Sequence, residues 1–223
     1  MKKRILIAVI AAVAVCGIGV GVYAATNQGD TMYQAGKALR DARDGAQTAA
    51  LDSGIVATYK GKNVTRAEIE YQRATDVLRA EDAKVGGRTD AEIAEGIIRG
   101  MILLEEAQAQ GLSATEEEIE AMVSSAREAY ALPEGKEQLD AYFDGAGITA
   151  EEYFEMIRAQ APEIIARQKL KDAVGKKYCE ENGLEFTKID PPEEVQKAQE
   201  DYIQQLFDAH ADEIVYHAEG EDN

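Results

Sequence analysis

Four Thr-x-x-Glu motifs, each followed by an apolar residue, constrain the fold of this chain more than any other feature. They are Thr65 to Glu68, Thr89 to Glu92, Thr115 to Glu118 and Thr149 to Glu152, followed by Ile69, Ile93, Ile119 and Tyr153. In such a capping box, the threonine hydroxyl accepts a hydrogen bond from the amide three residues on, and the glutamate accepts one from the threonine amide. Each motif therefore predicts the start of a helix, and together they predict a mainly α-helical fold.

Glycine and proline residues indicate where these helices end. The stop signals are Gly86-Gly87, Gly111, Pro133 with Gly135, Gly145 and Gly147, and Asn182-Gly183. Asp190-Pro191-Pro192-Glu193 indicates a fifth start, with proline at the first helical position. These signals predict helices over 66–84, 90–110, 116–130, 135–144, 150–181 and 192–210. Pro162 lies inside the fifth helix and should kink it or divide it near Gln160.

Two short segments are better suited to strands than to helices. Ile55–Tyr59 is β-prone and leads into a turn at Gly61, and Ile214, Val215 and Tyr216 are β-formers that break the helical pattern near the end of the chain. We expect the two segments to pair as a two-stranded element packed on helices, because an isolated ribbon of this size is only marginally stable. The pairing would join the start and the end of the domain.

The N-terminus has the pattern of an export segment. Lys2, Lys3 and Arg4 precede an uncharged apolar run, Ile5–Val22, which orients the basic end toward the cytoplasm. The run is long enough to span a bilayer, which favours an uncleaved single-pass anchor in the cell membrane. Cleavage near Ala24, or lipidation at Cys16, would be the alternatives. All three place the remaining chain outside the cytoplasm.

The rest of the chain divides by composition. Residues 1–25 form the signal or anchor, and residues 26–53 have few large apolar side chains and only weak helical periodicity over Met32–Leu51. We interpret 26–53 as a tether, partly helical, that holds the domain off the membrane. Residues 54–217 form the helical domain, and 218–223 an acidic tail.

Charge and chemistry exclude several classes of function. The chain has 42 Asp and Glu against 24 Lys and Arg, a net charge of −18, which disfavours nucleic acid and favours cationic partners. His210 and His217 are the only histidines, and no phosphate-binding loop, G-x-S-x-G motif or paired-cysteine motif is present. We therefore expect no enzyme activity, no catalytic residues, no metal site and no cofactor. Cys16 and Cys179 should not form an internal disulfide.

Three segments resemble the N-terminal chaperone domain of the SurA/PrsA family. Ile55–Tyr71 (IVATYKGKNVTRAEIEY) has the family's strand, turn and capped helix, and Ile97–Ile119 (IIRGMILLEEAQAQGLSATEEEI) looks like its central signature. Tyr153–Tyr178 looks like its long helix. The resemblance covers roughly residues 54–217 and implies that the C-terminal strand returns to the opening one.

The resemblance implies a membrane-tethered extracytoplasmic chaperone that binds unfolded or exported polypeptides without ATP. Many family members insert a parvulin-type prolyl isomerase domain after the long helix. Here only Gly183–Asp190 separates the long helix from the last one, so we expect no isomerase activity. The alternative function is a structural or scaffold subunit that holds one fixed partner in an envelope complex.

Client binding would need apolar side chains on the surface. Our candidates crowd around the turns of residues 130–156, where Gly145 and Gly147 would allow movement. They are Tyr130, Leu132, Tyr142, Phe143, Tyr153, Phe154 and Met156. The same residues have the spacing of a helical core, so burial is the competing interpretation.

Overall fold

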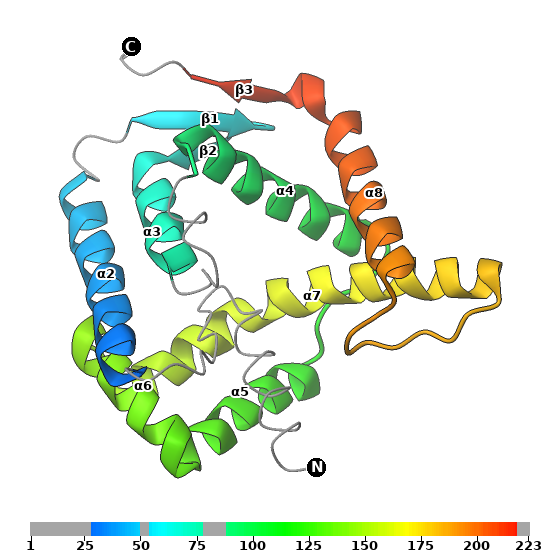
Figure 1. Ribbon diagram of the computed structural model, residues 1–223. Helices are drawn as coiled ribbons and strands as arrows, with labels where there is room; N and C mark the ends of the chain where they lie inside the picture. Colours follow the sequence, from blue (N-terminus) through cyan, green and yellow to red (C-terminus); the bar gives the residue numbers. More distant parts are fainter. Residues whose placement is uncertain (1–27, 50–53, 78–87, 218–223) are drawn as a thin grey trace.

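The computed structural model describes residues 28–49, 54–77 and 88–217 (Figure 1). These residues form seven α-helices and one three-stranded antiparallel sheet, which confirms the mainly α prediction. The helices are α2 (Gln28–Ala49), α3 (Arg66–Val77), α4 (Asp90–Ala109), α5 (Glu116–Ala131), α6 (Pro133–Ala146), α7 (Ala150–Asn182) and α8 (Glu193–Ala209). The strands are β1 (Ile55–Tyr59), β2 (Lys62–Thr65) and β3 (Ile214–Tyr216), with a 3₁₀ turn at Ala211–Glu213 before β3.

All four predicted capping boxes are present. The threonine amide donates to the glutamate carboxylate at 2.7–2.8 Å in each, and the glutamate amide donates to the threonine hydroxyl at 3.2–3.3 Å. Helices α3, α4, α5 and α7 therefore begin where the sequence indicates, each with two of its end amides satisfied locally.

At three places, the role of proline differs from the predicted one. Pro133 begins α6 instead of ending a helix, because its missing N–H costs nothing in the first turn. Helix α7 continues through Pro162 without the predicted division. Pro192 precedes α8 as its N-cap instead of being its first residue. The predicted ends of the helices otherwise agree within about two residues, apart from the end of 66–84, which lies outside the described residues.

The predicted pairing of the two ends of the domain is confirmed, but the sheet has a third strand. Its order is β2-β1-β3, and β1 pairs with β3 through Ala57–Tyr216, Thr58–Val215 and Tyr59–Ile214. The third strand arises because Lys60 and Gly61 both have positive φ, 50° and 77°. A two-residue loop of this geometry closes a tight hairpin. Lys62–Thr65 therefore folds back along β1 before it caps α3.

Helix α2 corrects the assignment of residues 26–53 to a tether. Met32, Ala35 and Leu39 are buried, and the helix lies against α6 and α3 (Figure 1). A Cβ on Gly36 would lie only 2.1 Å from the carbonyl oxygen of Tyr142, so the glycine permits the close crossing of α2 and α6. Residues 28–49 are thus packed as part of the helical domain. The proposed anchor and acidic tail lie outside the described residues.

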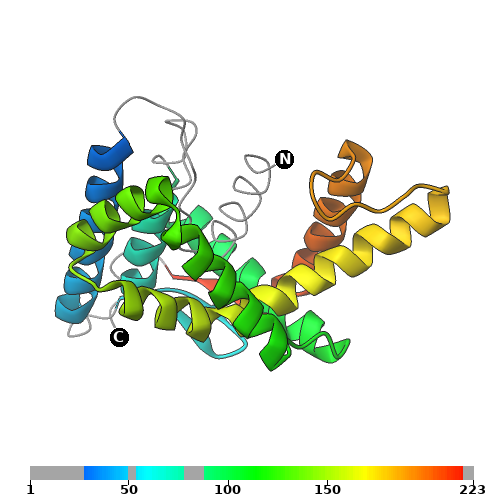
Figure 2. The same ribbon diagram turned by 90° about the horizontal axis from the view of Figure 1, so that it is seen from below.

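The core is divided between the two ends of the molecule, and α7 connects them (Figures 1 and 2). One cluster lies among α2, α5, α6 and the first half of α7. Another lies between the sheet and α4, and a smaller one joins α4 to α8 and the second half of α7. In the rest of the article, "aromatic end" means α2, α5, α6 and residues 150–161 of α7, and "sheet end" means the three strands with α4 and α8.

Candidate functional site

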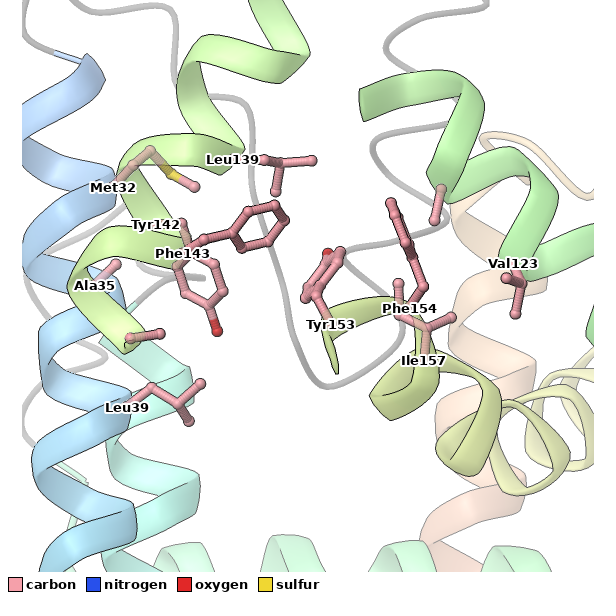
Figure 3. Close-up of a cluster of buried hydrophobic side chains, with 12 residues drawn as sticks. Met32, Ala35, Leu39, Val123, Leu139, Tyr142, Phe143, Tyr153, Phe154 and Ile157 are labelled. Atoms are coloured by element: carbon pink, nitrogen blue, oxygen red, sulfur yellow. The ribbon is translucent and has the colours of Figure 1, made fainter. Parts of the chain in front are cut away.

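The predicted client-binding residues lie together at the aromatic end. Phe143 of α6 and Tyr153 of α7 have ring centroids 5.1 Å apart, and Tyr130 of α5 lies 5.6 Å from Phe143 and 5.9 Å from Phe154. Figure 3 shows Phe143 on α6 pointing toward Tyr153 on α7, with Phe154 on the side of α7 that faces α5. Tilted and edge-to-face pairs at such distances are the favourable arrangements for aromatic side chains.

Four of the seven candidates are core residues, so their assignment to a client-binding surface needs correction. Tyr142 and Tyr153 are 0% exposed, Phe154 3% and Phe143 5%. The helices around them cover the rings on all sides, since α2 packs on α6 and α5 packs on α7. Burial also raises the pKa of Tyr142 far above its ordinary value, which keeps its hydroxyl neutral.

The other three candidates are more accessible. Tyr130 is half-buried, and its hydroxyl donates to Asp140 at 2.8 Å while the ammonium of Lys136 lies 4.8 Å from its ring. Met156 is half-buried against the aromatic cluster. Leu132, between α5 and α6, is 41% exposed. Of the predicted set, it alone belongs to the large exposed hydrophobic residues.

The sequence analysis missed most of the exposed apolar residues. Among the described residues, the large exposed hydrophobic side chains are Tyr33, Ile55, Leu132, Leu184, Ile189, Val215 and Tyr216. Three of them, Ile55, Val215 and Tyr216, belong to β1 and β3. A signal was available, because a strand at the edge of a small sheet is covered on one face at most.

The connection between α7 and α8 carries two more exposed apolar residues, Leu184 and Ile189. A partly buried ion pair holds this connection on α7. Lys188 Nζ lies 3.0 Å from Oδ2 of Asp172, whose side chain is 7% exposed. Phe186 packs against Gly175, where a Cβ would lie 2.6 Å from its ring. The connection is therefore anchored to α7, which leaves Ile189 outward and 75% exposed.

A charged cluster fixes the hairpin on α4. Lys60 and Lys62 donate to Glu105 at 3.1 and 3.0 Å, and the Tyr59 hydroxyl donates to the same carboxylate at 3.0 Å. Partial burial would raise the pKa of Glu105, but the hydrogen bonds from Lys62, Lys60 and Tyr59 outweigh it and lower this pKa to about 2. A carboxylate so strongly held as an anion is a structural partner and a poor general base.

Both histidines contact other side chains of the fold. His210 follows α8, and its Nδ1 lies 2.6 Å from Glu213 Oε2, while its ring packs edge-on against Tyr59. His217 Nε2 lies 3.0 Å from the Thr58 hydroxyl on the open face of the sheet. In the part of the chain that the structure describes, no three His, Cys, Asp or Glu residues are grouped as a metal site.

Comparisons with protein-family models, with curated proteins and with solved structures find no match to this chain. The resemblance to the SurA/PrsA family thus remains a prediction from the sequence. Over residues 28–49, 54–77 and 88–217, no helix is both long enough and apolar enough to cross a membrane. The apolar run Ile5–Val22 lies outside those residues.

Proposed function

We propose that this chain is a membrane-tethered extracytoplasmic chaperone of the SurA/PrsA type, which binds unfolded or exported polypeptides without ATP. The observation that carries the proposal is the group of exposed apolar side chains at the sheet end, Ile55, Val215 and Tyr216. They lie on a chain of net charge −18. Apolar side chains offer transient contacts to an unfolded chain, and the surrounding negative charge keeps the complex soluble.

The same proposal excludes prolyl isomerase activity. Helix α7 ends at Asn182 and α8 begins at Glu193, so the position where family members carry a parvulin domain holds only a short connection. That connection is itself bound to α7 through Lys188 and Phe186. We therefore propose that the chain acts as the chaperone module alone.

The test is suppression of aggregation. The full chain in detergent micelles should slow the aggregation of several unrelated, chemically unfolded proteins without nucleotide. It should not accelerate isomerisation of a proline tetrapeptide above the buffer rate. An acidic protein of similar net charge is the control, because it separates apolar binding from charge alone. Loss of protection for all clients would contradict the proposal.

The alternative function, a scaffold subunit, predicts a different result. It would give one stoichiometric partner in a pulldown from solubilised membranes and no protection of unrelated clients. The proposed location has its own test: protease added to spheroplasts should degrade the domain, because the basic Lys2–Arg4 flank orients the apolar run with its C-terminal side outward. Protection from the protease would contradict this orientation.

A further inference from the structure

We propose that the outer edge of β3 binds extended, basic segments of unfolded polypeptides by taking them up as a fourth strand of the sheet. The inference rests on the proposed chaperone function and names the surface where clients would bind. The client-binding surface then lies at the sheet end and not at the aromatic end, whose rings are buried.

Among the described residues, no strand pairs with the edge of β3 that faces away from β1. Lys60 N–H donates to the Glu213 carbonyl, and His217 N–H donates to the Val56 carbonyl, at 3.3 and 2.9 Å. Because strand residues alternate in the direction of their hydrogen-bonding groups, residues 213, 215 and 217 face β1. Tyr216 N–H and the carbonyl groups of Ile214 and Tyr216 consequently face away from β1, at the end of the order β2-β1-β3.

The edge lacks the usual chemical protection against pairing. Natural edge strands commonly carry lysine, proline or an inward-pointing charge, whereas β3 reads Ile-Val-Tyr. Its shortness is a protective feature. A strand of three residues offers few hydrogen bonds to a guest, so binding would be weak and reversible, as a chaperone requires.

The side chains of β3 add apolar contacts on both faces of the sheet. Val215 is 52% exposed and Tyr216 46% exposed, and neighbouring residues of a strand point to opposite faces. Alternate side chains of an added strand would lie beside them, as in other cases of β-augmentation.

The charge of the C-terminal region favours a basic guest over a second copy of this chain. Residues 198–223 contain no Lys or Arg and eight acidic residues: Glu200, Asp201, Asp208, Asp212, Glu213, Glu219, Glu221 and Asp222. Of these, Glu213 pairs with Lys60 of the hairpin at 3.4 Å. Two such edges brought together would place like charges side by side, which is unfavourable. A segment with lysines flanking its apolar residues would instead be attracted.

The test uses the full chain in detergent micelles and a fluorescent peptide of alternating Val and Thr with Lys at both ends. Binding is followed by fluorescence anisotropy. Tyr216→Pro removes the outward N–H and the ring, whereas Tyr216→Ala removes the ring alone. Proline at this outward position removes no bond to β1. Ile189→Ser is the control at the other exposed apolar site, and circular dichroism checks that each variant is folded.

We expect Tyr216→Pro to bind the peptide about twofold to tenfold more weakly than Tyr216→Ala, the effect of one backbone hydrogen bond. A peptide N-methylated at every internal residue has no N–H donor on either edge and should lose binding to the unaltered chain, a result that needs no variant. Ile189→Ser should bind normally. Equal affinities for the two Tyr216 variants, or undiminished binding of the methylated peptide, would overturn the proposal.

Two further results separate the possible causes. If the chain protects clients from aggregation but N-methylation does not weaken peptide binding, the edge inference fails and the chaperone function stands. If the chain protects no client, the chaperone function fails whatever the peptide does. A concentration-dependent dimer in sedimentation that Tyr216→Pro abolishes would show a second copy on the edge and would overturn the client as occupant.

Discussion

The aromatic end and the sheet end of this molecule each bury an apolar cluster, but they differ in how far their outermost elements are covered. At the aromatic end, large rings such as Tyr142 and Tyr153 are 0% exposed, whereas at the sheet end Val215 and Tyr216 are about half exposed. The aromatic end packs four helical segments around its rings. The sheet end covers one face of three short strands with α4 and leaves an outer edge.

The difference teaches that the number of covering layers, and not the size of the side chain, decides which apolar residues a partner can reach. A ring at a helix crossing is enclosed because neighbouring helices pack to within side-chain contact. A residue on a terminal edge strand has one backbone neighbour and one face covered. The surface for binding is therefore expected where the fold stops adding layers.

The largest expected effect comes from the aromatic end. Replacing Tyr142, Phe143 and Phe154 together with Ser should abolish the folded state, because each buried aromatic removed costs about 3–5 kcal/mol and a domain has only about 5–15 kcal/mol of stability. Loss of the helical circular-dichroism signal is the readout. The matched triple Leu132, Ile189 and Val215 to Ser should stay folded. A folded aromatic triple would contradict the burial of this end.

The crossing of α2 and α6 gives the next largest effect. Gly36→Ala places a Cβ 2.1 Å from a backbone oxygen, which forces the helices apart and should destabilise the domain by about 3 kcal/mol. Urea unfolding measures the change. Gly96→Ala on α4 is the control, because its Cβ would have an ordinary 3.6 Å contact and should stabilise by about 0.5–1 kcal/mol. Equal effects at the two positions would mean that α2 is a tether after all.

Removal of the edge strand should have a moderate effect. Deleting residues 211–223 removes the pairing of β3 with β1 and exposes the core beneath Ile214. The melting temperature should fall by several degrees. Deleting residues 218–223 alone leaves β3 in place and is the control. If the longer deletion melted like the full chain, the closing strand would be dispensable.

The smallest effect concerns the charged cluster at the hairpin. The pKa of Glu105 is about 2 in the folded protein and about 4.3 in an unfolded chain. The carboxylate therefore stabilises the fold above about pH 4.3, and this contribution is lost as the pH falls toward 2. Glu105→Gln should lower stability at pH 7 by about 1 kcal/mol, a value reduced by solvent screening.

Thermal unfolding between pH 7 and pH 2 measures this difference, which should close as the pH falls. Glu137, exposed on α6, is the control position for the same substitution. If the difference in thermal stability between Glu105→Gln and the unaltered chain grew as the pH fell, the sign of the pKa shift of Glu105 would be wrong.

Features that depend on local chemistry were predictable from the sequence. The capping boxes at Thr89, Thr115 and Thr149 set helix starts through contacts three residues apart. The β-prone character of Ile55–Tyr59 and Ile214–Tyr216 was also visible locally, whereas their pairing was implied by the resemblance to the SurA/PrsA family. The β2 strand was missed because its residues also have the pattern of a turn and a helix cap.

Features that depend on contacts between distant segments were not predictable. The burial of α2 requires Gly36 to meet the backbone of α6 about a hundred residues later, and nothing local indicates that meeting. The candidate site failed for the same reason. Tyr142 and Phe154 have the spacing of either a surface or a core, and only the neighbouring helices decide which.

Crosslinking in intact cells tests most directly whether clients reach the sheet end. A photoactivatable amino acid at Val215 is compared with one at Leu132, which is exposed to a similar degree, 52% against 41%, but lies at the aromatic end. We expect a range of exported proteins crosslinked from position 215 and few from 132. Abundant client crosslinks from 132 with none from 215 would contradict this account of the binding surface.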